Sequence, residues 1–145
     1  MKFKEYISIL NETAESLNEG YGRVNIFFYK STRNGQKRLP ITGSDLPKYF
    51  NSKGLSLFRD REKFTKTVLE LGRNINKWYD FCRKYLILSD NITIDDMNPI
   101  RNGDWGAFRN EPVPNMKPIF SAFIDSKDWI SIVFAVDSKI DQEIA

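Results

Sequence analysis

Carboxylates are the main residues of this 145-residue chain that could do chemistry, because it has no histidine and one cysteine, Cys82. The absence of histidine excludes Ser-His-Asp and Cys-His catalysis and nearly every familiar zinc site. Four acidic residues could offer oxygen ligands to a hard cation, but they lack the alternation and turn glycine of an EF-hand loop: Asp95, Asp96, Asp104 and Glu111. Such residues usually form turns and caps. We therefore predict no catalytic residue, no metal site and no cofactor. We expect a non-enzymatic protein, with a carboxylate enzyme using Asp95, Asp96 and Asp104 as the alternative.

Cys82 has no partner for a disulfide within the chain, so it suits a reducing compartment. It falls on an apolar helical spacing, which favours a buried, unreactive thiol. No apolar run reaches the about 20 residues that span a bilayer, and charges interrupt the N-terminal stretch that a secretory signal would need. We expect a protein that is neither transmembrane nor secreted.

Positive charge is concentrated in the middle of the chain. The formal net charge is only +3, but residues 21–90 carry 15 basic and 6 acidic residues between two acidic flanks. Phe27 and Tyr29 interleave with these cations, a combination typical of single-strand binders. Two alternatives stay open, namely an acidic end that covers the basic middle and a solvated surface of mixed charge. The candidate nucleic-acid contacts are Arg33, Lys37, Arg38, Lys48 and Lys53.

An aromatic and proline-rich loop is the second candidate site. Residues 97–118 hold four of the six prolines, and long irregular connections inside small domains are often functional. Trp105, Phe108 and Arg109 are of the types enriched at protein-binding hot spots. We predict that they contact a protein partner, with anchoring of the loop onto the core as the alternative.

Two hairpins are expected to build the sheet. In residues 23–31 the side chains alternate, so that Val24, Ile26 and Phe28 share one face. The dipeptide Asn34-Gly35 favours a tight turn, and a return strand over 37–42 follows it. A second hairpin is predicted from strands over 118–124 and 129–136, with residues 132–136 covered on both faces.

Three helical segments are expected to accompany these strands. An amphipathic helix is predicted over residues 2–17, and a capped helical turn over 44–54 that ends at Gly54. Seven apolar residues spaced by three or four predict one long helix over about 60–84. The expected fold is α+β, with an antiparallel sheet of about four or five strands packed on this long helix. Residues 20–145 would form one globular domain, with the N-terminal helix as an accessory.

The N-terminus carries the one resemblance to a known family. Residues 1–7 (MKFKEYI), followed by Leu17-Asn18-Glu19-Gly20, resemble the start of capsid-targeted internal and core proteins of T-even-like bacteriophages. In that family a short leader directs the protein into the prohead, and a maturation protease cuts after a Leu/Ile-x-Glu tripeptide. The resemblance implies a removable leader at residues 1–19, with Leu17 and Glu19 in the tripeptide and Gly20 after the cut. A docked amphipathic helix is the alternative for the same residues.

These observations predict a small bacteriophage-type binding protein that blocks or modulates a host or viral macromolecule. The leader resemblance implies packaging in the virion, so the expected locations are the host cytoplasm and the virion interior. A protein partner is the first expectation. Nucleic-acid binding through residues 21–90 is the alternative, and a membrane partner is not expected.

Overall fold

The fold is described by a computed structural model for residues 23–139. The helix expected over residues 2–17 and the leader at 1–19 lie outside the described residues. In chain order the elements are β1 (Val24–Thr32), β2 (Gly35–Leu39), η1 (Gly43–Lys48), α2 (Ser52–Arg59), α3 (Arg61–Leu71), α4 (Ile75–Tyr85), η2 (Ile94–Asp96), β3 (Met97–Pro99), η3 (Gly106–Phe108), β4 (Met116–Asp125) and β5 (Ile130–Asp137).

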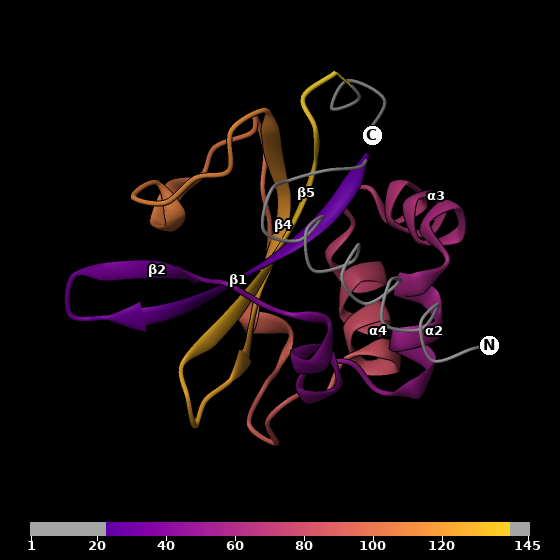
Figure 1. The fold of residues 1–145 in the computed structure, drawn as a ribbon, viewed down its shortest axis with the longest axis horizontal. Coiled ribbons are helices and arrows are strands. Elements are labelled where there is room, and N and C mark those ends of the chain that lie inside the picture. Colours follow the sequence, from indigo (N-terminus) through magenta and orange to yellow (C-terminus); the bar gives the residue numbers. More distant parts are fainter. Residues whose placement is uncertain (1–22, 140–145) are drawn as a thin grey trace.

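The five strands form one antiparallel sheet in the order β2-β1-β5-β4-β3. The α+β class and the antiparallel sheet are therefore confirmed. Both hairpins form, and the C-terminal strand β5 lies between β1 and β4. Figure 1 shows α2, α3 and α4 on one side of this sheet, while the hairpin β1–β2 projects away from them to the left.

The main core lies between the sheet and the helices. The predicted face of β1 contributes Val24, Ile26 and Phe28, and Trp78 of α4 packs on the sheet with its ring 4.1 Å from the ring of Phe120. The other face of the sheet holds a smaller apolar cluster that includes Phe27, Tyr29 and Val133. Residues 132–136 are buried throughout, because both clusters cover β5.

The prediction of one long helix over 60–84 is wrong. The segment forms two helices, because α3 ends at Gly72 with φ of 55°, a left-handed backbone that favours glycine. Asn74 then starts α4 by accepting a hydrogen bond from the backbone N–H of Lys77 at 3.1 Å. The indole N–H of Trp78 donates to the carbonyl of Gly72 at 2.8 Å, so this carbonyl has a hydrogen-bond donor at the point where the two helices separate. Both helices bury apolar residues in the same core, so the spacing continues across the break.

Gly54 does not end a helix as predicted. It lies inside α2 and is buried where that helix meets the C-terminal end of α4. A β-carbon at this position would lie 2.2 Å from the carbonyl oxygen of Tyr85. The glycine therefore permits a close approach of two helices, and the helical turn predicted over 44–54 divides into η1 and the start of α2.

Candidate nucleic-acid interface

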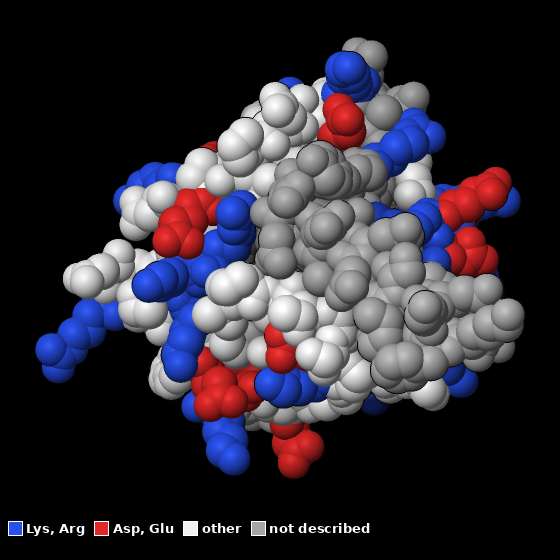
Figure 2. Space-filling view, in the orientation of Figure 1, with Lys and Arg blue, Asp and Glu red and all other residues white. Residues whose placement is uncertain are grey.

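The hairpin β1–β2 carries cations on both of its strands. Lys30 of β1 lies directly opposite Lys37 of β2 in the ladder, and Arg33 lies in the connecting turn. All three residues are exposed, and the sequence holds no acidic residue from 23 to 44. Figure 2 shows Lys and Arg side chains gathered over this hairpin at the left of the molecule. Like charges that face each other across a ladder destabilise it, so this arrangement does not serve the stability of the hairpin.

An exposed tryptophan lies beside the part of β1 that leads into the turn of the same hairpin. Trp129 follows the turn between β4 and β5, and 59% of it is exposed. Its carbonyl oxygen accepts a hydrogen bond from the backbone N–H of Ser31 at 3.0 Å. The indole ring lies 5.9 Å from the ring of Phe123, which leaves most of the indole in solvent. The hydrogen bond to Ser31 places the backbone of Trp129 beside the residue that follows Lys30 in β1, while the indole packs toward Phe123 of β4.

The backbone of Trp129 has φ of 58°, a left-handed conformation that is uncommon for a bulky residue. Asp125 forms the turn by accepting the backbone N–H groups of Lys127 at 2.9 Å and Asp128 at 3.2 Å. The last position of such a turn usually holds glycine or asparagine. Sequence reasoning placed Trp129 at the start of a strand and missed it as a site residue. The signal available in the sequence was a tryptophan at a turn position that usually holds glycine or asparagine.

The five cations predicted to bind nucleic acid do not form one cluster. Arg33, Lys37 and Arg38 share the hairpin, whereas Lys48 ends η1 and pairs with Asp45 at 3.3 Å. Lys53 lies in α2, where it lines a separate pocket. The hairpin therefore retains three of the predicted contacts and adds Lys30.

The aromatic loop is anchored to the sheet. Phe108 is buried and its ring lies 4.6 Å from the ring of Tyr29, while half-buried Trp105 packs on the same cluster. Arg109 is exposed, and its guanidinium donates to the carbonyl of Gly106 in its own turn at 3.1 Å. Phe108 is therefore not accessible to a partner, and its burial accords with the anchoring alternative.

Glu111 holds the loop against the edge strand, a role that sequence reasoning missed. Its carboxylate accepts the backbone N–H of Arg38 at 2.6 Å, and its carbonyl accepts the Tyr29 hydroxyl at 2.6 Å. Burial raises the pKa of the Tyr29 hydroxyl well above its usual range. The exposed backbone edge of β2 is thereby partly covered, which hinders pairing with another chain.

Two of the acidic residues considered for chemistry, and Cys82, have structural roles in this fold. Asp96 accepts the backbone N–H of Thr93 at 2.8 Å and Asp104 accepts that of Gly106 at 2.9 Å, so the predicted capping role is confirmed for both. Burial raises the pKa of the Cys82 thiol, which disfavours the thiolate. Within residues 23–139, no three histidine, cysteine, aspartate or glutamate side chains come together as a metal site would require.

Leu17, Glu19 and Gly20 of the implied processing site lie outside the described residues. In the part that the structure describes, none of the helices has the length and apolar character needed to cross a membrane. Comparison of the chain with protein-family models, with curated proteins and with solved structures finds no match.

Proposed function

We propose that this protein binds single-stranded nucleic acid without chemical turnover, using the hairpin β1–β2 and Trp129. The observation that carries the proposal is the backbone hydrogen bond from Ser31 to Trp129, which holds the residue with the exposed indole beside the strand that carries Lys30. Lys30, Arg33 and Lys37 would neutralise backbone phosphates, and the indole would stack on a base. A single strand is favoured because a base must leave a duplex stack before it can reach a side chain on a protein surface.

The protein-binding alternative at Trp105, Phe108 and Arg109 has less support. Burial of Phe108 removes the central apolar contact of that set, and Arg109 is engaged within its own turn. The hairpin, by comparison, has no acidic residue of its own and extends from the body of the molecule (Figure 1), although the Glu111 carboxylate contacts the backbone of Arg38 in β2. Binding to a nucleic acid would itself block or modulate that macromolecule.

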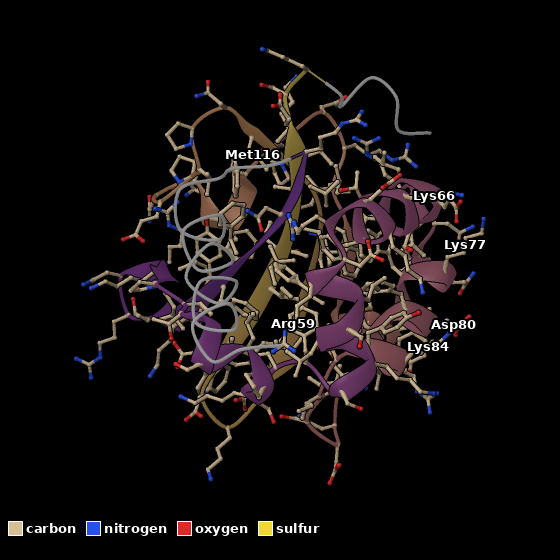
Figure 3. All side chains as sticks on the ribbon, turned by 45° about the vertical axis from the view of Figure 1, so that its right-hand side comes forward. Arg59, Lys66, Lys77, Asp80, Lys84 and Met116 are labelled. Carbon is tan, nitrogen blue, oxygen red and sulfur yellow. The ribbon has the colours of Figure 1, made fainter. Side chains whose placement is uncertain are left out.

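Fluorescence anisotropy with a labelled oligothymidine and the matching duplex tests the proposal. We expect tighter binding to the single strand and an affinity that falls steeply with salt. In Lys30→Gln/Lys37→Gln the slope of the logarithm of the binding constant against the logarithm of the salt concentration should become less steep by about 1.4. Each lost phosphate contact on a single strand contributes about 0.7 to this slope. The matched control, Lys66→Gln/Lys77→Gln, removes the same charge from the exposed surfaces of α3 and α4 (Figure 3) and should retain the affinity.

The stacking contact is tested by replacing Trp129. Trp129→Gly should weaken oligonucleotide binding about 10-fold to 100-fold, the usual value of one stacked base, and Trp129→Phe should restore most of it. Quenching of tryptophan fluorescence on binding should disappear in the glycine variant, because Trp78 is fully buried and Trp105 is half-buried. Equal affinity for duplex and single strand, or binding that ignores both sets of substitutions, would reject the proposal.

A further inference from the structure

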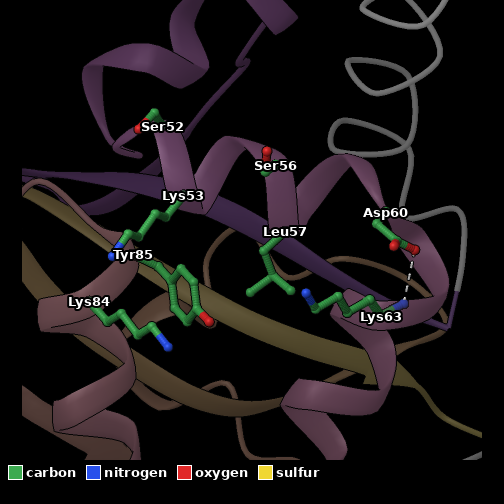
Figure 4. A pocket seen from close by; sticks show the side chains of 8 residues that line it. All are labelled: Ser52, Lys53, Ser56, Leu57, Asp60, Lys63, Lys84 and Tyr85. Atoms are coloured by element: carbon green, nitrogen blue, oxygen red, sulfur yellow. Dashed lines mark hydrogen bonds between the residues drawn. The ribbon is translucent and has the colours of Figure 1, made fainter.

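An open pocket lies in the helical layer, away from the sheet. It has a volume of about 670 Å³ and lies where α2 and the start of α3 face the end of α4. Figure 4 shows Lys63 and Lys84 reaching toward each other from opposite sides, with the Tyr85 hydroxyl between them in this view. The lining residues are Ser52, Lys53, Ser56, Leu57, Asp60, Lys63, Lys84 and Tyr85.

The pocket has an excess of positive charge. Its lining includes three lysines, Lys53, Lys63 and Lys84, and one carboxylate, Asp60, whose side chain accepts the backbone N–H of Lys63 at 3.2 Å. Among residues 23–139, no carboxylate lies within ion-pair distance of these three ammonium groups. Three cations gathered at one concavity repel one another, and an anion that bridges them would relieve the repulsion.

The walls of the pocket are held together by Asn51, the residue that starts α2. Its side-chain oxygen accepts the backbone N–H of Gly54 at 2.9 Å, and its side-chain nitrogen donates to the carbonyl of Lys84 at 2.8 Å. Its backbone N–H donates to the carbonyl of Tyr85 at 3.1 Å. These bonds connect the N-terminal end of α2 to the C-terminal end of α4, so the backbone that carries Lys53 and Lys84 is positioned before any ligand binds.

We propose that this pocket binds a phosphate group that carries, or lies beside, more than one negative charge. Three ammonium donors and the hydroxyls of Ser52, Ser56 and Tyr85 match an anion with several acceptor oxygens better than they match a single carboxylate. Leu57 and the ring of Tyr85 supply an apolar wall for whatever bears the phosphate; the Lys84 ammonium lies 5.2 Å from this ring. The site is separate from the hairpin and does not depend on the proposed function.

Calorimetric titration at low salt with tripolyphosphate tests the site. The wild-type protein should bind it at one site, and Lys63→Gln/Lys84→Gln should weaken binding about 100-fold, since each of the two lost charged hydrogen bonds contributes roughly 10-fold. The control Lys66→Gln/Lys77→Gln removes one lysine from each of the same two helices, outside this pocket, and should retain the affinity (Figure 3). Circular dichroism would show that both variants are folded. No binding by the wild-type protein, or equal losses in pocket and control variants, would overturn the proposal.

Oligothymidine, added as a second ligand, identifies the source of the phosphate. If tripolyphosphate and the oligonucleotide compete, and the pocket variant weakens both, then the pocket receives the backbone of a nucleic acid. If both bind together, the ligand is a free phosphate compound. Lys30→Gln/Lys37→Gln should leave tripolyphosphate binding unchanged, so a failure of the hairpin proposal is distinguishable from a failure of this one.

Discussion

Lys30 of β1 and Lys37 of β2 lie directly opposite each other in an antiparallel ladder, with both side chains exposed to solvent. Opposed like charges destabilise a strand pair, whereas opposed unlike charges contribute roughly 0.2–1 kcal/mol to its stability. A single substitution that puts an acidic residue opposite a lysine should therefore make the hairpin more stable. Stability of the hairpin favours unlike charges at these two positions, whereas the proposed binding of phosphates favours two positive charges.

Lys37→Glu should separate these two demands. We expect the free energy of unfolding to rise by about 0.5 kcal/mol, because a carboxylate would then face Lys30. Oligonucleotide affinity should fall, and its salt dependence should become weaker. Urea unfolding and anisotropy measure the two effects. Lys77→Glu in α4 has the same charge change away from the hairpin, and an equal loss of affinity there would contradict a role for the hairpin.

Trp129 should be replaceable by glycine with little loss of stability. Glycine relaxes the left-handed backbone and loses the contact with Phe123, so we expect a stability within about 1 kcal/mol of wild type. Trp129→Ala loses the same contact but keeps a β-carbon at positive φ, and should be about 1 kcal/mol less stable than the glycine variant. Denaturant unfolding of the two variants provides the comparison. Equal stabilities would show that the backbone conformation at this position carries no strain.

Gly54→Ala should destabilise the protein by about 3 kcal/mol. The added β-carbon would lie 2.2 Å from the Tyr85 carbonyl oxygen and 2.8 Å from the ring of Phe50, so α2 and α4 would have to separate. Tripolyphosphate binding should weaken as well, because the pocket lies between the same helices. Ser56→Ala on the exposed side of α2 is the stability control and should change it by less than about 0.5 kcal/mol. A stable Gly54→Ala protein would show that the helix contact is adaptable.

Tyr29 should contribute to loss of stability in alkali. Burial raises its pKa above the usual value near 10, so above that pH the folded chain keeps a proton that the unfolded chain releases. The free energy of unfolding should therefore be fully present below about pH 10 and fall as the pH rises further. Buried Cys82, whose pKa is also raised, adds a similar loss that starts near pH 9.

Tyr29→Phe tests this contribution. The variant loses the hydrogen bond to the Glu111 carbonyl and should be about 1 kcal/mol less stable at neutral pH. Its unfolding free energy should then decline less steeply above pH 10 than that of the wild-type protein. Thermal or urea unfolding across this range, in a Cys82→Ala background for both proteins, isolates the tyrosine. Parallel pH profiles would exclude Tyr29 as the source.

Phe108 should matter for stability and Arg109 should not. Phe108→Ala removes a buried ring from the cluster around Tyr29 and should lower the free energy of unfolding by about 3 kcal/mol. Release of the loop should also free Glu111, so the amide of Arg38 should exchange its hydrogen faster. Arg109→Ala should change stability by less than about 0.5 kcal/mol and leave that amide protected. Hydrogen exchange measured by NMR distinguishes loop anchoring from a purely local cavity.

Several local features were predictable because neighbouring residues determine them. The first hairpin forms as predicted, but its turn lies one residue earlier, at Arg33-Asn34, with Gly35 as the first residue of β2. The alternation in β1 correctly assigned Val24, Ile26 and Phe28 to the main core. Apolar spacing placed Phe64 and Trp78 in that core as well. The same spacing concealed the break at Gly72, because two short helices that cover one core repeat the pattern of a single long helix.

The sites depended on contacts between distant parts of the chain. Residue types and spacing alone determined the hairpins, the positive middle and the absence of histidine chemistry. Only the tertiary structure inserted β5 between β1 and β4, which placed Trp129 beside Ser31, and only helix packing brought Lys53, Lys63 and Lys84 to one pocket. The physical reason is that turn and strand preferences act over a few residues, whereas strand order and helix contacts are selected by burial of apolar surface across the whole domain.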